Sequence, residues 1–138
     1  MNKLFGALIG IVICTSVTAD MNDFRCFKSI GVKPPLKLQF VFQTDKSDMG
    51  YVIYQNGNSP IVVKNVKERE VKKIPGGGPS VIESQWEEVT TDGIGGKYII
   101  VSQGALVSEF QYVRKQDGKI FKFAEDTAVS TDDGCEWK

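Results

Sequence analysis

Two pairs of adjacent carboxylates are the side chains in this 138-residue sequence that could perform acid–base chemistry. Glu87-Glu88 and Asp132-Asp133 supply the residue types that glycosidases use as acid and base. Neighbouring residues on a strand point to opposite faces, so Glu87 and Glu88 cannot converge on one bond. Asp132-Asp133-Gly134 has the composition of a turn and lacks the third spaced carboxylate of a calcium loop. Neither pair predicts a catalytic or metal centre.

Nucleophilic and phosphate-binding chemistry is also poorly supported. The chain contains no histidine, which excludes Ser-His-Asp and Cys-His nucleophile systems, histidine zinc sites and a histidine pH switch. The glycine cluster 93–97 resembles a phosphate loop, but such loops lead into a helix, whereas Tyr98 begins a predicted strand. We interpret the cluster as a hairpin turn and expect a protein that is not an enzyme and uses no metal or cofactor.

The charge balance bears on the class of partner. Seventeen Lys and Arg residues cancel seventeen Asp and Glu residues. This balance argues against a nucleic-acid-binding protein that works through a basic face. We expect a protein partner instead.

The first nineteen residues have the layout of a secretory signal peptide. A single positive charge at Lys3 precedes the apolar run Leu4 to Ile13, and Val17-Thr18-Ala19 has small residues where a signal peptidase reads. The run is too short to span a bilayer, which needs roughly 20 apolar residues. The residue immediately before Cys14 is Ile13, whereas a lipid-anchor motif has a small residue there, so a lipid anchor is not expected. We predict a cleaved leader over 1–19, a single domain over 20–138, and a soluble product in the periplasm or the medium.

The cysteines support the same compartment. Cleavage after Ala19 removes Cys14 and leaves Cys26 and Cys135. In an oxidising compartment an isolated pair of this kind forms a disulfide, the alternative being two free thiols. A bond closing about 110 residues would stabilise the fold by roughly 4–5 kcal/mol in the chain-entropy model.

The remaining sequence has the pattern of short strands. Residues 36–43 alternate apolar and polar side chains, and Asp117-Gly118 separates two further runs as a hairpin turn. Residues 80–91 fit a strand or a helix, and we favour a strand that pairs with 97–101. The other expected strands cover 24–28, 50–54, 61–64, 67–74 as an edge or exposed strand, 106–114 and 119–123. About eight strands predict an all-β antiparallel barrel or sandwich, closed by one disulfide.

Two loops are candidates for partner binding. Gly76, Gly77, Gly78 and Pro79 cannot lie inside a regular element, so they form a flexible loop that ends at Ser80. The second candidate is the expected turn 92–96 with Lys97 and Tyr98 at its exit. A small β-domain without catalytic groups binds through loops displayed on a rigid sheet.

Phe24-Arg25-Cys26 near the expected mature start and Gly96 to Gly104 form two motifs that resemble parts of the bacterial periplasmic inhibitors of C-type lysozyme. Phe24-Arg25-Cys26 resembles their aromatic-x-Cys opening, and residues 96–104 resemble their G-x-Y-x-x-x-S-K-G strand and loop. The resemblance implies a small β-barrel, a bond from the early cysteine to one near the end, and partner contact at Ser102. Gln103 stands where the family has its inhibitory lysine, and the family's S-G-x-x-Y loop has no match upstream of Gly96.

These observations lead to one hypothesis and three alternatives. We expect an exported inhibitor that inserts loops into a partner enzyme such as a lysozyme. The same scaffold would suit a periplasmic immunity protein that neutralises a delivered toxin. A lipocalin-like carrier with a ligand in its barrel, or a subunit of a surface assembly that pairs through 67–74, would also fit.

Overall fold

The computed structural model describes residues 23–137, so the predicted leader over 1–19 lies outside the described residues. The main strands are β1 (Asp23–Ser29), β2 (Lys37–Phe42), β3 (Met49–Tyr54), β4 (Ile61–Lys72), β5 (Val81–Thr90), β6 (Gly93–Gln103), β7 (Leu106–Val113) and β8 (Ile120–Glu125). A 3₁₀ turn, η1 (Thr127–Val129), and two short strands, β9 (Ser130–Thr131) and β10 (Gly134–Cys135), follow them.

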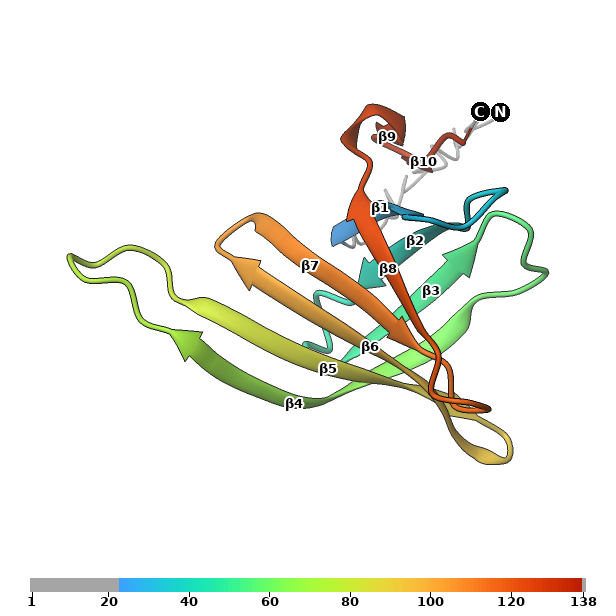
Figure 1. Cartoon of the computed structure of the whole chain (residues 1–138), viewed down its shortest axis with the longest axis horizontal. Coiled ribbons are helices and arrows are strands. Elements are labelled where there is room, and N and C mark those ends of the chain that lie inside the picture. The colour runs from blue at the N-terminus through green and yellow to red at the C-terminus, as the bar shows by residue number, and fades with distance from the viewer. Residues whose placement is uncertain (1–22, 138) are drawn as a thin grey trace, which may run out of the picture.

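The eight main strands form a closed barrel in chain order (Figure 1). Every neighbouring pair is antiparallel, and β1 closes the barrel against β8 through Phe27 opposite Glu125 and Ser29 opposite Phe123. This confirms the all-β prediction and selects the barrel over the sandwich. Across the described residues, the longest helical element is the three-residue η1.

The ambiguous segment 80–91 is the strand β5, as favoured from the sequence. It pairs with β6 from Val81 opposite Gln103 to Thr90 opposite Gly93. The hairpin turn at Asp117-Gly118 is also confirmed, with Gly118 at φ 70° between β7 and β8. The guanidinium of Arg114 and the amide of Lys119 hold the pKa of Asp117 well below its usual range.

Two boundaries differ from the sequence prediction. The strand predicted separately over 67–74 is instead the second half of β4, which runs without a break from Ile61 to Lys72 and pairs with β5 along most of its length. The turn expected over 92–96 consists of Thr91 and Asp92 alone, since Thr90 already pairs with Gly93. Gly95 and Gly96 therefore lie inside β6, where packing rather than turn geometry requires them.

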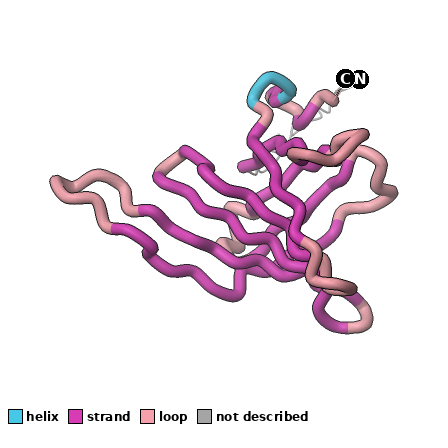
Figure 2. The backbone as a smooth tube through the Cα atoms, in the orientation of Figure 1, coloured by secondary structure: helices cyan, strands magenta, loops and turns pink. Residues whose placement is uncertain are grey.

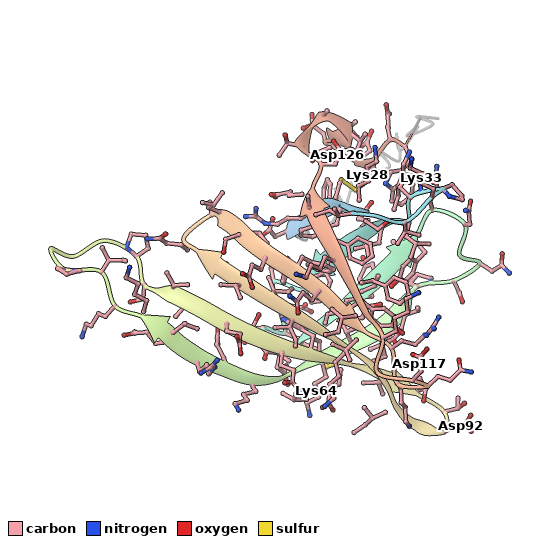
Figure 3. All side chains as sticks on the ribbon, viewed as in Figure 1. Lys28, Lys33, Lys64, Asp92, Asp117 and Asp126 are labelled. Carbon is pink, nitrogen blue, oxygen red and sulfur yellow. A yellow bond between two sulfur atoms is a disulfide. The ribbon has the colours of Figure 1, made fainter. Side chains whose placement is uncertain are left out.

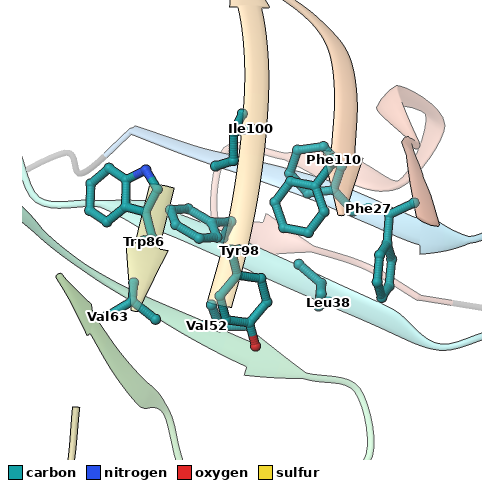
Figure 4. Close-up of a cluster of buried hydrophobic side chains, with 10 residues drawn as sticks. Phe27, Leu38, Val52, Val63, Trp86, Tyr98, Ile100 and Phe110 are labelled. Carbon is teal, nitrogen blue, oxygen red and sulfur yellow. The ribbon is translucent and has the colours of Figure 1, made fainter. Parts of the chain in front are cut away.

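The barrel interior is filled by large apolar side chains. The side chains labelled in Figure 4 point into the barrel from several strands. The buried cluster consists of Phe27, Leu38, Phe40, Val52, Val63, Trp86, Tyr98, Ile100, Phe110 and Phe123, with Tyr112 and Phe121 packed against it. Alternation explains the inward set on β2, where Leu38 and Phe40 are fully buried and Gln39 between them faces out.

The disulfide lies on the outer side of the barrel. Cys26 is bonded to Cys135 with 5.8 Å between their Cα atoms, as predicted (yellow bond, Figure 3). Phe27 faces the core, so Cys26 faces outward, yet it is only 1% exposed because the C-terminal segment covers it. The amide of Cys135 also donates to Gln39 Oε1 at 2.9 Å. The bond therefore ties the last described strand to the first.

Candidate binding site at one end of the barrel

A groove of about 640 Å³ opens at the end of the barrel where β4 and β5 project. Its floor is apolar, formed by Trp86, Ile100, Phe42 and Val107. Its polar lining residues are Asp23, Arg25, Ser47, Asp48, Asn65, Lys67, Glu68, Ser84 and Ser102. Val66 and Gly104 complete the lining. The groove thus combines an aromatic floor with a charged rim.

The charges on this rim are unevenly paired. Arg25 Nη1 donates to both carboxylate oxygens of Glu125, at 2.7 and 3.2 Å, so its charge is compensated inside the protein. Asp23, Asp48 and Glu68 form no ion pair with any described residue, and Lys67 is the one other cation in the lining. The rim therefore presents net negative charge to an incoming partner.

The β4–β5 hairpin extends beyond the rest of the barrel as an arm, and the predicted loop forms its tip (Figure 2). Gly76 and Gly77 have φ of 91° and 87°, in the left-handed region that other residues adopt at a cost. Gly76, Gly77 and Gly78 are exposed and surround a small hollow with Ser80. The glycines allow this tight tip and leave its backbone open to close approach.

The C-terminal end of the tip loop contacts the neighbouring β6–β7 turn. Gln103 Nε2 donates to the carbonyl oxygen of Pro79 at 3.3 Å, and Pro79 lies beside Gly104. Ser102 pairs with Ile82 next to this contact and lines the groove. The structure therefore brings three predicted sites, the glycine triplet, Ser80 and Ser102, to the same end of the barrel.

The other two predicted site residues lie elsewhere. Tyr98 is fully buried, and its hydroxyl lies 2.8 Å from that of Tyr54. Its side chain belongs to the core, which corrects the expectation that it contacts a partner. Inward alternation along β6 is the reason. Lys97 is exposed on the outer face, opposite Glu87 and Val113, and does not line the groove.

A buried polar network occupies the core toward the opposite end. Glu88 faces inward, and its Oε1 accepts hydrogen bonds from the Gly96 amide at 2.8 Å and the Tyr112 hydroxyl at 3.2 Å. Burial and the neighbouring Glu88 carboxylate raise the pKa of Tyr112 to about 12. Burial likewise raises the pKa values of Tyr98 and Tyr54. Through the two hydrogen bonds of Glu88, this network joins β5 to β6 and β7.

Sequence reasoning missed most of the groove. Asp23 and Arg25 point inward at the start of β1, but their role depends on the distant Glu125 and on which end of the barrel remains open. The charged run at 67–70 was predicted to lie on an edge or exposed strand, with no groove beside it. A bulge at Val66, visible as a register shift between Asn65 and Lys67, decides which of its charges face the groove. No local pattern marks that bulge.

Neither a metal-binding cluster nor a membrane-spanning helix is present in the described part of the chain. Residues 23–137 contain no group of three or more His, Cys, Asp or Glu side chains placed to hold a metal ion. Nor does any helix over that range have the length and apolar character needed to cross a bilayer. Comparison of the chain with protein-family models, curated proteins and solved structures finds no match.

Proposed function

We propose that this protein is an exported inhibitor that docks on a partner enzyme with the groove end of its barrel and presses the tip of the β4–β5 arm into the partner's cleft. The observation that carries the proposal is the arm itself. A glycine-rich tip projects on paired strands, and Gln103 donates a hydrogen bond to the Pro79 carbonyl where the tip loop joins β5. An arm of paired strands with an open backbone tip suits insertion, because the strands are already ordered before binding.

The rim charges favour a basic enzyme as the partner. Asp23, Asp48 and Glu68 would attract a positively charged surface and speed its approach. A lysozyme is the first enzyme to test, because of the motifs around Cys26 and at residues 96–104. A toxin delivered into the periplasm is the alternative target, and the protein would then act as an immunity protein through the same surface.

The groove supports the carrier alternative, but the filled core does not. A groove of about 640 Å³ is large enough for a small ligand. However, the interior that a lipocalin-like carrier would use is occupied by Phe40, Tyr98 and Phe110, all almost completely buried. A carrier would have to bind its ligand at the mouth alone, which makes this the weaker proposal.

Affinity capture with the mature protein, followed by inhibition assays on lysozymes and on every captured enzyme, tests the proposal. Replacing the Gly76–Gly78 triplet with alanines should weaken inhibition at least tenfold. Gly118→Ala is the matched control, since it changes an exposed positive-φ glycine in the β7–β8 turn at the other end. Failure to inhibit any captured enzyme, or equal losses in both variants, would refute the inhibitor proposal.

Export is tested on the same material. We expect the protein in the periplasmic or extracellular fraction to begin at Asp20, as measured by intact mass. Retention of the leader or recovery in the cytoplasm would contradict this part of the proposal.

A further inference from the structure

The ladder between β3 and β4 ends long before β4 does. The last pair is Met49 opposite Lys64, and the Asn65 amide then donates to the Asp48 carbonyl at 2.8 Å. Over 66–72, the backbone of β4 pairs with β5 alone among the described residues. The arm therefore has one open strand edge, in line with β3, and this edge borders the groove.

The bulge at Val66 determines which charged side chains of this edge face the groove and which face outward. Glu68 pairs with Ser84, and both line the groove, so Glu68 and Glu70 share the inner face of the arm. Arg69 forms an exposed ion pair with Glu83 and faces outward. The inner side of the open edge is thus acidic, continuous with Asp23 and Asp48 across the groove.

A second copy of this chain is a poor occupant of the edge. In a symmetric antiparallel pair, the residue at the twofold axis lies opposite its own copy. An axis at Glu68 also places Lys67 opposite Arg69, and an axis at Arg69 places Glu68 opposite Glu70. Like charges directly opposite each other are destabilising, so self-pairing centred on Glu68 or Arg69 is discouraged. An axis at Val71 would place Glu70 opposite Lys72, but the irregularity of β4 between these two residues interrupts the strand there.

We propose that an extended segment of the bound protein adds as a strand to residues 66–72 and lies over the groove, with a basic side chain facing Glu68 and Glu70 and an apolar side chain above Trp86. Main-chain hydrogen bonds would give affinity, and the groove would select alternate side chains. The segment runs antiparallel to β4 and therefore in line with β3. This inference rests on the proposed function only in that the segment belongs to the inhibited partner.

A displayed library of random nine-residue peptides, selected on the mature protein, provides the probe. We expect enriched peptides that alternate polar and apolar residues and carry Lys or Arg. Their binding should slow amide hydrogen exchange within 66–70. The double variant E68K/E70K should weaken binding at least tenfold, whereas Asp92→Lys, in the turn at the far end (Figure 3), should leave it within twofold.

Peptide N-methylation tests strand addition directly. Methylating alternate residues that face β4 should abolish binding, and methylating the other set should leave it within twofold. No enrichment, binding that maps outside the groove, or equal sensitivity to both sets would overturn the inference. Inhibition that depends on Gly76–Gly78 but not on Glu68 and Glu70 would also overturn it, while sustaining the proposed function. Peptide binding by a protein that inhibits no enzyme would overturn the proposed function instead.

Discussion

Gly96 lies in the middle of β6, and we predict that Gly96→Ala destabilises the barrel through one neighbour. A Cβ at this position would overlap the ring and hydroxyl of Tyr112, so Tyr112 would have to move. Its hydroxyl would then leave the buried carboxylate of Glu88. Backbone conformation is not the cause, since Gly96 does not have positive φ.

The magnitude follows from three contributions. Overpacking a filled core costs about 1–3 kcal/mol. Losing a hydrogen bond to a buried charged group costs about 1.5–3 kcal/mol. Alanine recovers about 0.5–1 kcal/mol relative to glycine inside a strand. We therefore expect a net loss of about 2–5 kcal/mol in the free energy of unfolding.

Urea denaturation followed by tryptophan fluorescence measures this loss, and a double-mutant cycle identifies its cause. In a Tyr112→Ala background the overlap is gone, so Gly96→Ala should become neutral or slightly stabilising. Gly78→Ala in the exposed arm loop is the control and should change stability by less than about 1 kcal/mol. An undiminished cost of Gly96→Ala in the Tyr112→Ala background would refute the reasoning.

Three further predictions concern the disulfide, the buried tyrosines and the charged edge. Replacing both Cys26 and Cys135 with alanine should cost up to about 4–5 kcal/mol in urea denaturation, because the bond spans 109 residues. Between pH 10 and pH 12 the protein should lose stability, because the raised pKa of Tyr112 favours its neutral form in the folded state. Tyrosinate absorbance should therefore rise together with unfolding. Tyr112→Phe should reduce the pH dependence, and part of it should remain because burial also raises the pKa values of Tyr54 and Tyr98. Replacing the charges at 67–70 with threonine should produce concentration-dependent association in sedimentation experiments.

Each of these predictions has an outcome that contradicts it. If removing Cys26 and Cys135 lowered the free energy of unfolding by less than about 1 kcal/mol, the bond would restrict the conformational entropy of the unfolded chain only slightly. Full ionisation of Tyr112 in the folded protein near pH 10 would contradict the burial argument. A threonine variant that stays monomeric at high concentration would show that the charges at 67–70 are not what prevents self-association through the open edge of β4.

The architecture was predictable because its signals are local. Alternation over residues 36–43 and the Asp117-Gly118 turn each specify a strand or hairpin without reference to the rest of the chain. The disulfide followed from counting cysteines after the expected cleavage. The separate strand predicted over 67–74 and the turn predicted over 92–96 were wrong in their bounds, because the length of a strand and the position of a turn depend on the register with the partner strand.

The candidate site was only partly predictable. The glycine triplet at 76–78 is visible in the sequence because no regular element tolerates it. Tyr98 was correctly placed on a strand, but its position at the exit of a predicted turn suggested partner contact, whereas alternation along β6 buries its side chain. Val66 and Glu68 acquire their roles from a bulge and from the early end of β3, which are properties of the assembled sheet.

The seam between β1 and β8 has a consequence for the order of events during synthesis. Because the first strand pairs with the eighth, the ring of strands cannot close until Glu125 has been made. Pairings so distant in sequence form slowly. If the chain is exported as proposed, a polypeptide threaded from its N-terminus would cross before a finished barrel existed, and the ring would close on the far side, where Cys26 and Cys135 would be oxidised.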